Sequence, residues 1–325
     1  MIRATAFFGL LGLALATGLI VYHGAGEVFT VLAGAGFGIL WASLFHLIPM
    51  AVNARAWQVL LPGAARPGII FFTWAVWVRE SVNGLLPVAR VGGEIVSARL
   101  LIWHGVRPSP AVASLVVDMT LSIVSQFVFT VVGLGLLMLR SDDVATIGRI
   151  ALALLVAVPI VVALVAVQRL GMFGVLGRLF NALFRDRWAM LVAGAHRLDR
   201  WVRLLYRRRD RIVSCGLWQL VGWLLGAGEI YLALYFLDHP VSLLDALLIE
   251  ALAQAVSSAA FVVPAAIGVQ EGGFLLFGAL LGLSPEISLA LALARRARDL
   301  IMFVPPLLVW QWLEARRLLA ARPSQ

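Results

Sequence analysis

The 325-residue sequence contains no lysine and only one cysteine, Cys215, so all 26 of its basic side chains are arginines. A phosphate-binding loop of the G-x-x-x-x-G-K-[ST] type and Schiff-base catalysis both require a lysine, and both are therefore excluded. A single cysteine also excludes an intrachain disulfide and a cysteine-rich metal site.

Charge is scarce as well. Charged residues make up 13% of the chain and hydrophobic residues 62%, and the mean hydropathy is +0.97. Soluble domains are about 25% charged and about 45–50% apolar, so the composition predicts an all-α polytopic membrane protein. In that setting the net charge of +9 indicates positively charged cytoplasmic loops rather than a nucleic-acid partner. The sequence has no HExxH or GxSxG motif, and we expect no catalytic residues, metal site or cofactor.

Apolar stretches long enough to span a bilayer indicate how the chain is organised. A spanning helix needs roughly 20 predominantly apolar residues. Six stretches meet this requirement: 4–22, 29–50, 110–139, 147–168, 212–237 and 286–313. Two further apolar regions, 69–105 and 243–282, are interrupted by glycine, proline and charged residues.

The segment 169–211 carries most of the net charge. It holds 11 arginines and three aspartates, which is +8 of the total +9. Such a basic segment between two spans predicts a cytoplasmic location, with both termini cytoplasmic and the chain in the bacterial inner membrane. Its apolar residues recur at helical spacing between the arginines, a pattern typical of amphipathic helices at an anionic membrane surface.

The two interrupted regions resemble each other when one is shifted by 177 residues. Pro87 then aligns with Pro264 and Glu94 with Glu271, among six identities in the window 81–108. The alignment predicts a repeat over 29–139 and a second over 212–313. Counting the membrane crossings between them gives the repeats opposite orientations, as in many transporters.

Each interrupted region is interpreted as a re-entrant helical hairpin, because irregular backbone at membrane depth must be buried in protein or line a wet cavity. A pair of kinked spanning helices is the alternative. The expected hinge residues are prolines that break helices and glycine pairs that allow a reversal: Pro87, Gly92, Gly93, Pro264, Gly272 and Gly273. Glu94 and Glu271 would lie at the two hairpin tips.

Ionisable residues inside apolar segments are candidate functional residues. Arg295 and Arg298 lie on one face of the last span, and Arg296 and Asp299 are spaced for a local ion pair. The arginines either bind an anionic lipid headgroup or pair structurally with acids, and both interpretations stay open. The remaining candidates lie in the first repeat or at the second hairpin: Arg79, Glu80, Arg90, Asp118 and Gln270. We expect Glu229 and Glu250 to be structural and His46 to be interfacial.

Three motifs resemble the membrane (flippase) domain of the lysyl-phosphatidylglycerol synthase family. They are Pro87 with Val91-Gly92-Gly93-Glu94, Pro264 with Gly268-Val269-Gln270-Glu271-Gly272-Gly273, and Arg295-Arg296-Ala297-Arg298-Asp299-Leu300. The similarity is greatest to the branch associated with hopanoid biosynthesis, although Ala265-Ala266-Ile267 replaces the family's usual Pro-Gly-Gly run. The resemblance implies inverted repeats, re-entrant helices and lipid movement between leaflets, with Glu94, Asp118, Glu271, Arg295 and Arg298 as functional residues. The family's aminoacyl-transfer domain has no counterpart in this sequence, so we expect no lipid synthesis.

The sequence thus predicts a flippase-like protein that moves an anionic or amphiphilic lipid, either a phospholipid or a hopanoid or isoprenoid-linked lipid. Membrane lipids are its expected partners, with lipid-biosynthesis enzymes as a second class. Two alternatives remain: a membrane enzyme of isoprenoid or glycolipid metabolism, and a non-transporting accessory protein of hopanoid biosynthesis.

Overall fold

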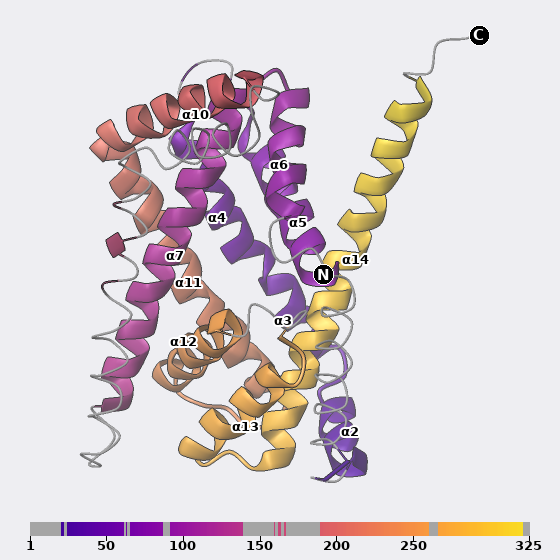
Figure 1. The fold of residues 1–325 in the computed structure, drawn as a ribbon. Coiled ribbons are helices and arrows are strands. Elements are labelled where there is room, and N and C mark those ends of the chain that lie inside the picture. The colour runs from indigo at the N-terminus through magenta and orange to yellow at the C-terminus, as the bar shows by residue number, and fades with distance from the viewer. Residues whose placement is uncertain are drawn as a thin grey trace. The chain divides into compact units, whose positions relative to one another are not determined.

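A computed structural model describes residues 25–61, 66–86, 92–138, 189–259 and 266–320, together with a few single residues between these ranges. Every regular element within them is a helix, which confirms the all-α prediction (Figure 1). Three of the predicted site residues, Pro87, Arg90 and Pro264, lie outside the described residues, as do almost all of the expected spans 4–22 and 147–168.

The chain divides into two compact units. Unit 1 comprises residues 1–50, 74–97 and 224–325, and unit 2 comprises 51–73 and 98–223. Both expected repeats contribute segments to unit 1, so the units do not coincide with the repeats. The inverted relation between the repeats stays a prediction.

Unit 1 is organised around the long helix α14 (Pro285–Ala320). This helix packs against α2 (Ala25–Gly34), α3 (Gly38–Phe45) and α13 (Val269–Leu280), and α13 also packs against α12 (Leu243–Ala259). Figure 1 shows α12 and α13 beside the first half of α14. Unit 1 also includes most of α5 (Ile69–Leu85), the first half of α6 (Gly92–Trp103) and the part of α11 (Arg209–Phe236) from Leu224 onward.

Apolar side chains from α3, α11, α12, α13 and α14 form the core of unit 1. Its fully buried members include Ile230, Leu234, Ile249, Phe274 and Leu289. The first three turns of α14 pack into this core through small and aliphatic residues that precede position 295. The arginines of α14 follow directly after this packed segment.

Unit 2 contains α4 (Leu47–Leu60) from residue 51, α7 (Pro108–Met138), α10 (Ala189–Arg207) and the first half of α11. Trp57 is fully buried, donates its indole N–H to the Ser114 hydroxyl at 3.1 Å and meets the Phe72 ring edge-on. A buried indole needs such an acceptor, so this contact fixes α4 against α7.

The basic helix α10 packs across α7 (Figure 1). Val202 and Leu205 are buried whereas Arg200 and Arg203 are exposed, so this helix has an apolar face and a basic face. The buried residues of this helix pack against protein, and the location of the basic segment at a membrane surface stays a prediction.

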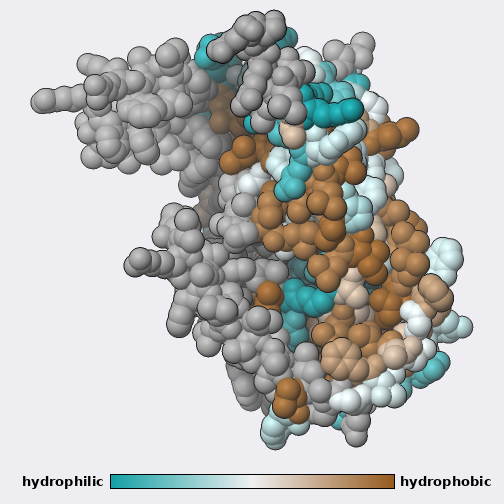
Figure 2. All heavy atoms as spheres, turned by 90° about the vertical axis from the view of Figure 1, so that its right-hand side faces the viewer, coloured by the Kyte–Doolittle hydropathy of each residue, from teal (hydrophilic) through white to brown (hydrophobic). Residues whose placement is uncertain are grey.

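Among the residues that the structure describes, three helical stretches are long and apolar enough to cross a membrane: Gly38–Leu60, Pro108–Met138 and Arg209–Phe236. The last two coincide with expected spans, whereas the first is displaced from the expected 29–50 because the chain turns at 35–37. The sixth expected span lies inside α14, where charged residues lower the hydropathy. Hydrophobic side chains cover much of the described surface in Figure 2, as the lipid-facing side of such helices requires. Six complete spans stay a prediction.

The interrupted regions are helix pairs, α5 with α6 and α12 with α13. Whether either pair is re-entrant or spans the bilayer stays a prediction. The glycine pairs lie inside helices: Gly92 and Gly93 open α6, and Gly272 and Gly273 belong to the first turns of α13. The backbone before α13 turns instead at Ala266 and Gly268, with φ of 49° and 83°.

Candidate functional site

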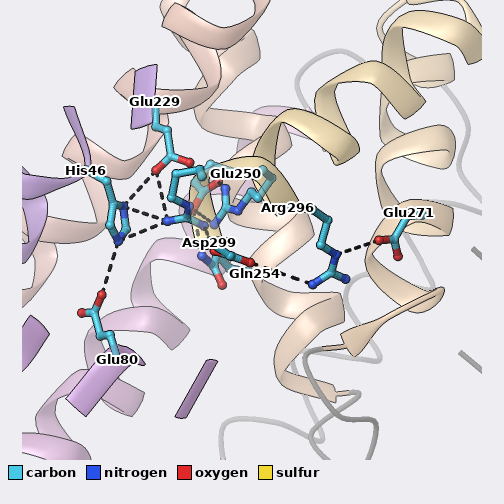
Figure 3. Close-up of polar contacts among 10 residues, drawn as sticks. His46, Glu80, Glu229, Glu250, Gln254, Glu271, Arg296 and Asp299 are labelled. Carbon is cyan, nitrogen blue, oxygen red and sulfur yellow. Dashed lines mark hydrogen bonds and ion pairs between the residues drawn. The ribbon is translucent and has the colours of Figure 1, made fainter. Parts of the chain in front are cut away.

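Charged and polar side chains of unit 1 converge on the middle of α14. We call this group the α14 cluster; it consists of His46, Arg79, Glu80, Glu229, Glu250, Glu271, Arg295, Arg296, Arg298 and Asp299. The members that Figure 3 labels meet from the turn between α3 and α4 and from α5, α11, α12, α13 and α14. Arg79 adds its charge beside Glu80.

Arg295 forms a bidentate ion pair with Glu250 of α12. Its two terminal nitrogens donate to the two carboxylate oxygens at 2.5 and 3.1 Å. Both side chains are buried, with exposed fractions of 8% and 3%. Gly226 of α11 lies against this carboxylate, where an added Cβ would lie 3.4 Å from an oxygen. Parallel hydrogen bonds of this kind fix direction as well as distance.

Arg296 pairs with Glu271 on the other side of the helix. Its Nε donates to one carboxylate oxygen at 2.9 Å, and the second oxygen accepts the backbone N–H of Gly268 at 2.6 Å. Glu271 therefore caps the start of α13 and anchors it to α14, in the position where a carboxylate also suits the helix dipole. The expected local ion pair between Arg296 and Asp299 is confirmed at 3.9 Å.

Arg298 binds three partners. One terminal nitrogen lies 3.4 Å from Glu229 and also 2.9 and 3.1 Å from the two ring nitrogens of His46. The other donates to Asp299 at 3.0 Å. The imidazole in turn lies 2.9 Å from Glu229 and 3.3 Å from Glu80 (Figure 3).

The other predicted tip carboxylate, Glu94, lies between α5 and α6. Asn83 donates its amide to both Glu94 oxygens at 3.1 and 3.3 Å and accepts the backbone N–H of Gly93 at 2.8 Å. A Cβ at Gly93 would lie 2.4 Å from the Arg79 carbonyl oxygen, so only glycine allows this approach of the two helices. Glu94 and Glu271 therefore have separate partners.

A cavity of about 10 Å³ adjoins the cluster. Glu229, Arg295 and Arg298 line it together with apolar residues of α3, α11 and α14. Among the described residues, the Nε atoms of Arg295 and Arg298 are buried without a hydrogen-bond acceptor. An unsatisfied buried donor costs free energy, so each of these Nε atoms would gain from an acceptor that reaches it. The volume suits roughly one water-sized group.

Asp118 belongs to unit 2 rather than to the α14 cluster. It is buried in α7, accepts the side-chain amide of Gln219 at 2.8 Å and lies 4.0 Å from the Cys215 sulfur. Gln270 is half-buried in the first turn of α13, next to Glu271. Of the predicted site residues, the structure therefore gathers Arg79, Glu80 and Glu271 around the arginines of α14 and Asp299.

Sequence reasoning missed three members of the cluster. Glu229 and Glu250 were expected to be paired structurally, and they do pair with Arg298 and Arg295. His46 was expected to be interfacial, and it contacts Arg298. Charge balance could have identified the two glutamates from the sequence. Three arginines at membrane depth require several nearby acids, and Glu229 and Glu250 are among the few acids in the apolar segments.

The amino-acid sequence matches the family model of the lysylphosphatidylglycerol synthase TM region over residues 9–306. The chain belongs to this family. Together with its long apolar helices, this membership makes it a membrane protein involved in lipid biology. No curated protein and no solved structure matches the chain significantly.

Proposed function

We propose that this member of the lysylphosphatidylglycerol synthase TM family is a lipid translocase of the bacterial inner membrane. Its substrate is an anionic or amphiphilic lipid, either a phospholipid or a hopanoid or isoprenoid-linked lipid. The headgroup binds at Arg295 and Arg298 while the apolar tail stays in the bilayer. Both termini face the cytoplasm in this proposal.

The observation that carries the proposal is the pair of unsatisfied guanidinium donors beside a cavity inside an apolar helical unit. A planar guanidinium suits a phosphate, and ionisable groups at membrane depth usually mark a transport pathway. A cavity of about 10 Å³ admits one oxygen-sized group, so a whole headgroup requires the surrounding helices to separate. That requirement fits alternating access, in which this geometry is a closed state.

The arginines already hold carboxylates, and this supports an exchange mechanism. A phosphate that enters must displace Glu229 or Glu250 from its arginine, and the carboxylate returns when the lipid leaves. The exchange keeps each guanidinium paired, and the displaced carboxylate then needs another donor or a proton, because an uncompensated buried charge is costly. It also weakens binding enough for the lipid to be released on the other side.

The test is lipid scrambling by the purified full chain in liposomes that contain fluorescent phosphatidylglycerol. We expect the wild-type protein to equilibrate the leaflets faster than protein-free vesicles. Arg295→Gln and Arg298→Gln each remove a charge-assisted contact of about 1.5–3 kcal/mol, so each should slow transport by roughly ten- to a hundredfold. Arg316→Gln, on an exposed position of the same helix, is the matched control and should transport normally.

A rate equal to that of protein-free vesicles, across phospholipid, polyprenyl and hopanoid probes, would refute the proposal. Conversion of a lipid into a new product would instead favour a membrane enzyme. The exposed arginines of α10 favour an accessory role as the second candidate. That role predicts full function in cells for Arg295→Gln and loss of function when the α10 arginines are replaced.

A further inference from the structure

His46 occupies the turn between α3 and α4, and charged groups from three helices face it. Glu80 lies at 3.3 Å from Nε2, on α5, next to Arg79. Glu229 of α11 lies at 2.9 Å from Nδ1, and Arg298 of α14 lies within 3.1 Å of both ring nitrogens. The Phe303 ring closes the remaining side edge-on.

The two carboxylates and Arg298 stabilise opposite protonation states of the His46 imidazole. Two carboxylates, one at each ring nitrogen, are both satisfied only when both nitrogens carry a proton. One terminal nitrogen of Arg298 lies almost equally far from both ring nitrogens, at 2.9 and 3.1 Å, so it sits over the ring face. A guanidinium is attracted to the face of a neutral ring and repelled by an imidazolium, so Arg298 favours the unprotonated ring. The same ring therefore has two alternative sets of partners, and protonation decides between them.

The net charge of the α14 cluster also favours a protonated His46 when an anionic headgroup binds. It holds four guanidinium groups, Arg79, Arg295, Arg296 and Arg298, and five carboxylates, Glu80, Glu229, Glu250, Glu271 and Asp299. With a neutral imidazole the sum is +4 − 5 = −1, and with an imidazolium it is zero. A buried group with one excess negative charge repels an anionic headgroup, whereas the protonated cluster does not.

We propose that protonation of His46 releases Arg298 to bind the phosphate of an anionic lipid, so that one proton is taken up with each headgroup. The proton comes from the aqueous phase and binds whichever ring nitrogen carries no proton in the neutral imidazole. The imidazolium then donates to Glu80 and Glu229 and repels Arg298, whose freed N–H group turns to the phosphate. One positive and one negative charge enter together. This inference rests on the proposed function, because it requires a headgroup site at Arg298.

The test is calorimetric titration of the detergent-solubilised full chain with dihexanoyl phosphatidylglycerol. Titrations run from about pH 5 to 10, because carboxylates at both ring nitrogens stabilise the imidazolium and binding has to be measured above the range in which histidine ordinarily titrates. The affinity for the lipid should fall as pH rises. The decrease should approach tenfold per pH unit at the upper end, where His46 is unprotonated in the free protein and has to take up a proton when the lipid binds. Titrations in two buffers of different ionisation enthalpy should count close to one proton taken up per lipid at the upper end.

His46→Gln keeps a polar side chain but cannot titrate, so both the pH dependence and the proton uptake should disappear. His239→Gln is the matched control, since the imidazole of this exposed histidine of unit 1 bonds to the Leu237 carbonyl; both signals should persist.

Binding by the wild-type protein that is independent of pH and takes up no proton would overturn this inference and leave the proposed function standing. A pH dependence that persists in a folded His46→Gln variant would also overturn it. If His46→Gln fails to fold, the wild-type proton count alone decides. No binding at any pH would overturn the anionic headgroup site and this inference together.

Discussion

The ion pair between Arg295 and Glu250 allows a sharp test of what holds the centre of unit 1 together. Replacing Glu250 with leucine removes the only carboxylate bonded to both terminal nitrogens of Arg295, and the guanidinium stays buried in the helix bundle. Breaking one side of a buried pair costs about 3–5 kcal/mol, because the remaining charge has no counter-ion. The bidentate geometry and exposed fractions of 8% and 3% place this pair in that range rather than with surface pairs.

The reciprocal change, Arg295→Met, strands Glu250 and should cost a similar amount. The double variant replaces both members with apolar side chains, and such replacements are often neutral or stabilising. We therefore expect the double variant to be more stable than either single variant. The resulting coupling energy should be at least about 3 kcal/mol, above the usual range for exposed pairs.

The measurement is the free energy of unfolding in mixed micelles, obtained by titration with SDS and followed by tryptophan fluorescence. Arg316→Met on the same helix is the control, since a change at an exposed position should stay within about 0.5 kcal/mol. The reasoning is refuted if each single variant lowers the free energy of unfolding by less than about 1 kcal/mol and the two effects are additive. The ion pair between Arg295 and Glu250 would then contribute little to stability.

Three further predictions follow from particular contacts. Gly93→Ala should destabilise the protein by about 1–3 kcal/mol, because the added Cβ meets a backbone carbonyl of α5. Gly272→Ala is the control, since its Cβ meets nothing within 4 Å, and thermal unfolding compares the two variants. Asp118→Leu should cost about 1–3 kcal/mol by leaving a buried amide without its acceptor, and Asp118→Asn should retain most stability in the same assay. Because the native cysteine is buried, Arg316→Cys should react with an impermeant thiol reagent only from the cytoplasm and Asp238→Cys only from outside; the reverse pattern would contradict the orientation.

The helical class and two of the spans could be predicted because they depend on local hydropathy. The stretches 110–139 and 212–237 are apolar throughout, and the structure has them as single helices. The expected span 29–50 is displaced, because Gly36 adopts a positive φ and the helix restarts at Gly38. A window average does not register such a break, since the residues on both sides remain apolar.

The partners within the site could not be predicted from spacing along the chain. Arg295 binds Glu250, 45 residues away, and Arg298 contacts His46, 252 residues away. Only tertiary packing brings these residues together. The sequence did identify the arginines and Glu271 as candidates, because ionisable groups are rare in apolar segments, but it could not show which acid each arginine would bind.

The distribution of charge connects the orientation of the chain with its proposed transport. The segment 169–211 carries +8 of the net +9, and the rest of the chain holds 15 arginines and 14 acids, a sum of +1. Within that nearly balanced remainder, the α14 cluster reaches neutrality only with a proton on His46. A permanently positive site would hold an anionic headgroup too tightly to release it, and a permanently negative one would exclude it. A cluster whose charge changes by one proton meets both requirements, because it accepts the lipid when protonated and expels it when the proton leaves.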